Sequence, residues 1–135
     1  MSWTKTRMTK ETEVSKVVNL DYLCVKHGQQ IPTKDSENNI RKALGVLQED
    51  GIYAMFLWLE DKDKNKKIRQ NLISLLNDND IRKYLLKNSD GFPGDFKEFC
   101  KKLKDIAQDI DKLLFMKKIL ERTLTYALYH AKIGE

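Results

Sequence analysis

The sequence predicts an all-α fold, and three features support this prediction. Apolar residues recur at steps of three and four along most of the chain, the spacing of one helix face. No segment combines the alternation of a β-strand with a second segment able to pair with it. The composition, 41% hydrophobic and 33% charged over 135 residues, is ordinary for a helical domain. We therefore expect residues 1–135 to form one domain, a single bundle of five or six helices with a long C-terminal helix.

The amino-terminal part is expected to hold a basic arm and a first helix. Residues 1–10 are polar and basic, which is typical of a flexible arm. The first helix is predicted over residues 11–27, and Gly28 is expected to end it. Its apolar face would carry Val14, Val17, Val18, Tyr22 and Val25.

The second helix is predicted after a loop at residues 29–34, which contains Pro32. Asp35 or Ser36 can cap its start, and its apolar positions are Ile40, Leu44 and Leu47. Gly51 marks its end.

Residues 52–59 read IYAMFLWL, an unbroken apolar run whose periodicity alone cannot separate strand from helix. Its Ala, Met and Leu residues favour helix, and a lone strand would leave its backbone groups unpaired. We interpret it as a third helix, surrounded by the fold itself or by a partner. Trp58 within it is expected to pack in the core.

A basic segment follows at residues 62–69, KDKNKKIR, and leads into a fourth helix with apolar positions Ile68, Leu72, Leu75 and Leu76. A short fifth helix is predicted over residues 81–87, after the caps offered by residues 77–80.

The last element is predicted as one long helix from Asp95 to Lys132, after the turn NSDGFPG at residues 88–94. No Gly or Pro interrupts it, and at 1.5 Å per residue it would span roughly 55 Å. Its apolar seam would run through Phe99, Leu103, Ile106, Ile110, Leu113, Leu120, Leu124, Ala127 and Ala131.

Catalytic chemistry finds little support in the sequence. No Gly-rich phosphate loop, HExxH or GxSxG pattern is present. Asp105 and Asp109 would share a helix face beside Asp111, but the surrounding lysines indicate a solvated ion-pair face. We therefore expect that the chain is not an enzyme and has no catalytic residue.

A structural zinc site is also not expected. The chain does contain four soft ligands, the number that a structural zinc ion needs: Cys24, His27, Cys100 and His130. On one unbroken helix Cys100 and His130 would lie about 45 Å apart. We therefore predict no metal and no cofactor, and interpret both cysteines as buried thiols.

The cysteine content and the net charge suggest a cellular compartment and a class of partner. Two cysteines and no leader-like apolar stretch after Met1 lead us to expect a reducing, cytoplasmic environment. No window reaches eighteen apolar residues, so no membrane span is predicted. The net charge of +5 favours an anionic partner such as nucleic acid.

Tyr126 and Tyr129 lie three residues apart and off the main seam, beside Arg122. A stripe of aromatic residues next to arginine is typical of a protein interface. We expect these three residues to meet a protein partner.

Two segments resemble a known family. Residues 50–62, DGIYAMFLWLEDK, place a Gly before a very apolar helix that ends in Lys, and residues 113–132, LLFMKKILERTLTYALYHAK, combine a basic pair, aromatic residues and small residues. Both are similar to elements of the small all-helical subunit of type III-B (Cmr) CRISPR effector complexes. The first helix of that family carries an Arg shortly before a Tyr-Ala pair. This chain departs from that pattern, because Tyr22 is followed by Leu23 and no Arg lies shortly before it.

The resemblance implies a noncatalytic subunit that stacks with like subunits in a ribonucleoprotein and faces the duplex of guide RNA and target RNA. The expected partners are the other subunits and both RNAs, contacted through phosphate and shape rather than sequence. The candidate basic residues are Lys62, Lys64, Lys66, Lys67 and Arg69, with Lys101, Lys104, Lys117 and Lys118 as second candidates.

Two alternatives remain open at the level of sequence. One is a helical DNA-binding regulator that dimerises through its long C-terminal helix. The other is a protein-binding adaptor whose charges form only a solvated face.

Overall fold

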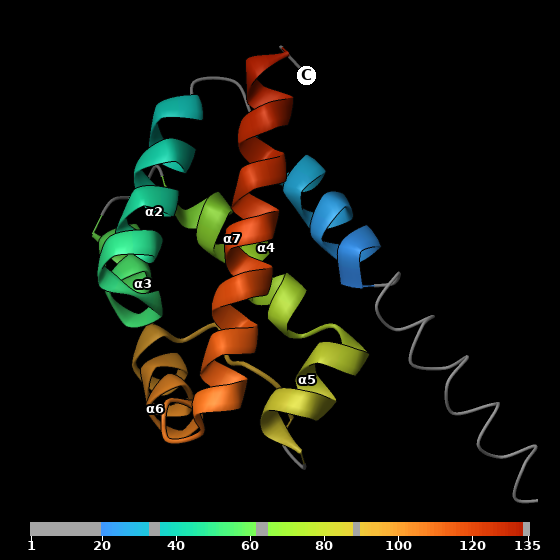
Figure 1. Cartoon of the computed structure of the whole chain (residues 1–135). Helices are drawn as coiled ribbons and strands as arrows, with labels where there is room; N and C mark the ends of the chain where they lie inside the picture. Colours follow the sequence, from blue (N-terminus) through green and yellow to red (C-terminus); the bar gives the residue numbers. More distant parts are fainter. Residues whose placement is uncertain (1–19, 33–35, 62–64, 88–89, 134–135) are drawn as a thin grey trace, which may run out of the picture.

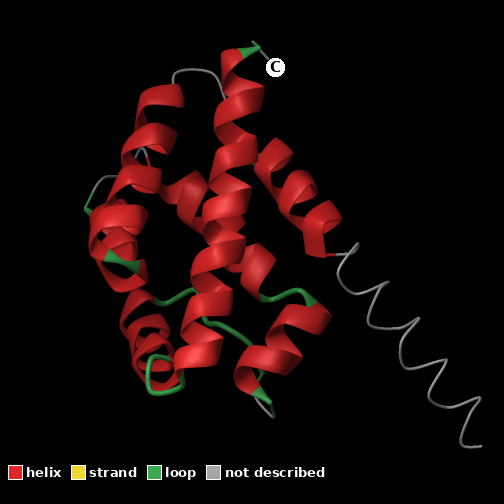
Figure 2. Ribbon diagram, in the orientation of Figure 1, coloured by secondary structure: helices red, strands yellow, loops and turns green. Residues whose placement is uncertain are grey.

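The computed structural model describes residues 20–32, 36–61, 65–87 and 90–133 (Figure 1). Within these residues the chain forms seven helices and no strand, which confirms the predicted all-α fold (Figure 2). The predicted basic arm at residues 1–10 lies outside the described part. The first helix is described over residues 20–30. The other helices are α2 (Glu37–Asp50), α3 (Ile52–Glu60), α4 (Lys66–Leu76), α5 (Asn79–Leu86), α6 (Phe96–Ile106) and α7 (Ile110–Lys132).

Helix α7 runs through the middle of the bundle, and the other helices are arranged around it (Figure 1). Helix α2 packs along one side of α7, and the first helix lies along another side. Helix α3 packs against α2, and α4 and α6 each pack against α3. Helices α5 and α6 lie at the end of the bundle where α7 begins.

The corner between α2 and α3 depends on one residue. Gly51 has φ 100° and ψ −178°, a backbone conformation that is essentially restricted to glycine. Its N–H donates to the carbonyl oxygens of Val46 and Leu47, which satisfies the end of α2 while α3 starts at the next residue. The predicted break at Gly51 is confirmed.

Residues 52–59 are helical as predicted, but only one face of α3 is covered. Its buried residues are Ile52, Met55, Phe56 and Leu59. Tyr53 and Leu57 are exposed, and Trp58 is half-buried against the core. The expectation that this run is surrounded by its own fold is therefore met on one face only.

The predicted unbroken helix from Asp95 to Lys132 was wrong, although the C-terminal helix is long, with 23 residues in α7. Helix α6 ends at Ile106, and Asp109 caps α7 by accepting hydrogen bonds from the backbone N–H groups of Asp111 (3.1 Å) and Lys112 (3.3 Å). Ile110, which the predicted seam would bury, is 62% exposed. Because Asp109 is a cap, it does not share a helix face with Asp105.

The break between α6 and α7 is explained by how the two helices pack. Phe99 of α6 packs edge-on against Phe56 of α3, with ring centroids 4.6 Å apart. The buried face of α7 packs instead against α2. Helices α6 and α7 thus pack against different neighbours, and the chain turns between them. A short polar side chain such as aspartate makes this turn inexpensive by capping the new helix.

Gly28 does not end the first helix, which continues to residue 30. A Cβ atom at Gly28 would lie 2.9 Å from the carbonyl oxygen of Thr123 and 3.1 Å from the Cβ of Tyr126. The glycine therefore permits close contact with α7. The buried positions of this helix are Cys24, His27 and Gly28, whereas Tyr22, which we placed on the apolar face, is exposed.

Replacement of Gly51 by alanine should lower the free energy of unfolding by about 1–3 kcal/mol, because alanine must adopt a strained conformation there. Gly45, inside α2, is the matched control, because nothing lies within 4 Å of a Cβ added to it. Gly45→Ala should raise stability by roughly 0.5–1 kcal/mol. Urea unfolding measures both changes, and a harmless Gly51→Ala would contradict the assigned corner.

The stability of the fold should fall as the pH drops below about 6.5. His27 is 7% exposed and its Nδ1 has no hydrogen-bond partner. Burial lowers the pKa of His27, nearby Lys26 lowers it further, and Asp78 opposes both. Since the folded pKa lies below the unfolded value, the unfolded chain takes up the proton first and is favoured in acid.

The control for this pH dependence is His27→Leu, which removes the titrating group from an apolar site. Urea midpoints between about pH 7.5 and 5.5, a range that brackets the histidine pKa, should fall for the parent and change less for the variant. An equal fall in both proteins would show that His27 is not responsible.

Candidate nucleic-acid interface

The start of α4 presents two exposed lysines. Helix α4 buries Ile68, Leu72, Leu75 and Leu76, which follow the predicted spacing and fix the rotation of the helix. Lys66 and Lys67 lie in its first turn, and both are exposed. The predicted candidates Lys62 and Lys64 precede this turn in sequence and lie outside the described residues.

The charge of this turn differs from that of four other helices, although α3 likewise has no acidic residue in its first turn. An acidic residue stands in the first turn of α2, α5, α6 and α7, where it complements the positive end of the helix dipole. The first turn of α4 has no acidic residue, and the side chain of Asn65 makes no capping hydrogen bond there. Two lysines therefore add to the positive end of a helix dipole. This arrangement attracts an anion.

Arg69, which the sequence placed among the phosphate-contacting residues, has an internal partner. Its guanidinium donates to the carboxylate of Glu60 at the end of α3, and its side chain is only 14% exposed. The Arg69 Nε atom is buried without a hydrogen-bond partner. Arg69 therefore ties α4 to α3. The sequence offered no sign that Glu60, nine residues earlier, would be its partner.

The second group of candidate lysines lies on other helices. Lys101 on α6 donates to Glu98 at 3.2 Å, and Lys104 is exposed on the same helix. Lys117 on α7 lies 3.9 Å from Glu121, and Lys118 beside it is exposed. Two of these four lysines thus have acidic neighbours.

The predicted protein-interface residues divide into two groups. Arg122 and Tyr126 both bind Asp21 of the first helix: the Arg122 guanidinium at 3.3 Å and the Tyr126 hydroxyl as donor at 2.9 Å. This hydrogen bond to Asp21 raises the pKa of Tyr126. Tyr129 is 59% exposed, with the Lys132 ammonium 6.0 Å from its ring centroid. The stripe is therefore partly an internal contact, which the sequence could not reveal because Asp21 lies about a hundred positions away.

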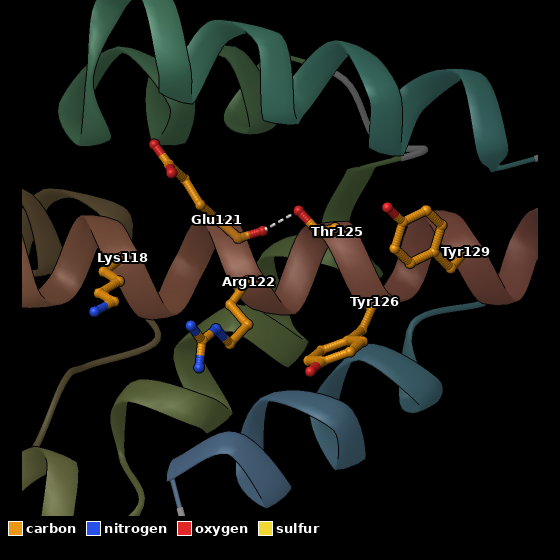
Figure 3. A pocket seen from close by; sticks show the side chains of 6 residues that line it. All are labelled: Lys118, Glu121, Arg122, Thr125, Tyr126 and Tyr129. Carbon is orange, nitrogen blue, oxygen red and sulfur yellow. Dashed lines mark hydrogen bonds between the residues drawn. The ribbon is translucent and has the colours of Figure 1, made fainter. Parts of the chain in front are cut away.

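The outer face of α7 carries a shallow hollow of about 350 Å³ (Figure 3). Lys118, Arg122 and Tyr126 project toward the first helix, and Glu121, Thr125 and Tyr129 project to the opposite side. The Thr125 hydroxyl donates to the Glu121 carbonyl oxygen at 2.7 Å. The lining of the hollow thus combines cationic, acidic and aromatic groups from both sides of α7.

No cluster of three or more His, Cys, Asp or Glu side chains able to hold a metal ion occurs among the described residues. Both cysteines are buried thiols, as predicted. Cys100 and His130 lie on separate helices, so the separation of about 45 Å expected along one straight helix does not apply to them. Among the helices described, none is both long and apolar enough to cross a membrane.

The chain was compared with protein families, curated proteins and solved structures. None of the three comparisons found a match. The assignment of a function therefore depends on the geometry of the interface and on the sequence resemblance.

Proposed function

We propose that this chain is a noncatalytic subunit of a cytoplasmic, RNA-guided antiviral ribonucleoprotein of the CRISPR type III class. In this proposal the start of α4 contacts the phosphates of the guide–target duplex. The observation that carries the proposal is the first turn of α4, where Lys66 and Lys67 lie exposed at the positive end of a helix with no acidic residue.

The arrangement has a physical cost that an anion would remove. Cations at a helix amino terminus are unfavourable by a few tenths of a kcal/mol up to about 1 kcal/mol each. A phosphate between the two lysines would turn this repulsion into attraction. Lys62 and Lys64, which precede the turn in sequence, would add two further contacts. Contacts of this kind recognise the backbone and the shape of a duplex and are independent of base sequence.

The resemblance to the small type III-B subunit supports the same surface. The resembling segment, residues 50–62, opens with Gly51, forms the apolar helix α3 and leads into the basic segment before α4. An apolar helix that anchors a basic turn on the surface is suited to hold phosphate-contacting lysines in place.

Exposed apolar side chains favour a role within an assembly. Ile110 and Leu114 lie one helical turn apart at the start of α7, and both are exposed. Tyr84 of α5 is also exposed and stacks edge-on with Phe115 at 5.0 Å between ring centroids. Apolar groups gathered on the surface are typical of protein contacts. They support docking of neighbouring subunits, and equally the alternative of a protein-binding adaptor.

The DNA-binding regulator receives less support. Its dimer would need the apolar seam of α7, but Met116, Leu120, Leu124 and Ala127 are buried inside the bundle. A regulator of this kind also needs a helix that reads DNA, and the short helix α5 buries Ile81 and Leu85.

Three double variants test the proposed interface, each replacing two lysines by glutamate: Lys66 with Lys67, Lys101 with Lys104, and Lys117 with Lys118. All three lower the net charge by the same amount, so a difference between them reports the position of the contact. Binding to an RNA duplex is measured by fluorescence anisotropy at several salt concentrations. The parent should show weak binding with a log–log salt slope of about −3 to −4, which corresponds to about four phosphate contacts.

The α4 variant should lose most of its affinity, and the other two should retain it. Arg69 is left unchanged because its pairing with Glu60 makes it a structural residue. Equal losses in all three variants would indicate attraction by net charge alone. Parent-like binding by the α4 variant would remove the main support for the proposal.

A further inference from the structure

A second, smaller hollow lies between the first helix and α7, and its walls are mostly apolar. Leu20 and Cys24 line it from the first helix, and Phe115 and Ile119 from α7, around a volume of about 180 Å³. Cys24 and Ile119 are buried, and the Cys24 thiol donates to the Ile119 carbonyl oxygen at 3.6 Å. This contact holds the two walls together, so the hollow is part of the packed structure.

Two cations complete the lining, Lys118 and Arg122. Figure 3 shows both side chains on the side of α7 that faces the first helix. Arg122 is paired with Asp21 at 3.3 Å, which offsets its charge. Lys118 is exposed and forms no ion pair with any other described residue. The site therefore has an excess of about one positive charge.

The thiol inside the hollow adds no opposing charge. Burial raises the pKa of Cys24 above its ordinary value, so the group is a neutral thiol at pH 7. An apolar group can contact it without cost, and an anion held by Lys118 meets no buried negative charge.

Volume and charge together define a class of ligand. An apolar cavity of roughly 150 Å³ is known to accept benzene, so a hollow of about 180 Å³ has room for one phenyl ring or one branched alkyl group. A single excess positive charge suits a single carboxylate. We propose that this hollow is a binding site for a small amphipathic monocarboxylate, whose apolar end packs against Leu20, Cys24, Phe115 and Ile119 while its carboxylate pairs with Lys118. The proposal is independent of RNA binding at α4.

The test uses 3-phenylpropionate and the full chain, followed by two-dimensional NMR. Saturable shifts should appear at the backbone amides of Cys24, Ile119 and their neighbours, with millimolar affinity. The neutral amide of the same acid should bind several-fold more weakly, because a partly exposed ion pair contributes up to about 1 kcal/mol, a factor of about five. Absence of saturable shifts at these amides would overturn the proposal.

Two variants and a matched control locate the site. Lys118→Glu should weaken binding by about tenfold, since it replaces attraction by repulsion. Lys104→Glu makes the same charge change on α6 and should leave binding unchanged. Leu20→Trp, at the half-buried edge of the hollow, should fill it and abolish binding with the helical circular dichroism preserved. Equal weakening by both lysine variants, or parent-like binding by Leu20→Trp, would contradict the assigned position.

A carboxylate of this kind can belong to a small molecule or to the carboxyl terminus of another protein, and a peptide ligand distinguishes the two. An acetylated tetrapeptide ending in leucine with a free carboxylate should bind no more tightly than 3-phenylpropionate if the ligand is a small molecule. Binding of the peptide alone would overturn this proposal and identify a docking site for a protein carboxyl terminus.

Discussion

The close contact between the first helix and α7 is the constraint on which the rest of the structure depends. It requires a residue without a side chain at Gly28, because a Cβ atom there would collide with the backbone of Thr123. Once the helices approach, Asp21 reaches both Arg122 and Tyr126. These contacts join residues far apart in the chain and cover the side of α7 that α2 leaves open. Helix α7 thereby becomes a core helix, and only its outer face and its first turns remain available to partners.

The turn between α6 and α7 has a second consequence. A single straight helix would project far beyond the bundle, whereas the break lets α6 pack against α3 and α7 pack against α2. The same break leaves Ile110 and Leu114 exposed at the start of α7. The apolar surface that favours assembly thus arises from the local geometry of the break, which exposes Ile110, whereas most of the predicted apolar seam is buried inside the fold.

The sequence predicted the fold class and most helices correctly where the information is local. The spacing of Ile68, Leu72, Leu75 and Leu76 identified the buried face of α4, and Gly51 identified the corner before α3. Local patterns could not show that Gly28 serves a helix contact, because its partners lie about a hundred residues away. They also could not show the break at Asp109, since nothing in residues 95–132 forbids a helix and only the packing of α6 and α7 demands a turn.

The candidate site was predicted in part. The sequence identified the basic segment that contains Lys66 and Lys67, and the structure places both on the surface. It could not show that Arg69 pairs with Glu60 and is largely buried. The functional account therefore depends on a small set of lysines at one helix start, and on the positive helix dipole that accompanies them.

The most direct measurement of this account is ultraviolet cross-linking of the chain to RNA in complexes isolated from its native cell, with the cross-linked peptides mapped by mass spectrometry. The account predicts cross-links in the peptide that contains Lys66 and Lys67, in complexes that also contain further protein subunits and a guide RNA. Cross-links confined to α6 or α7, or complexes that contain protein partners but no RNA, would contradict it.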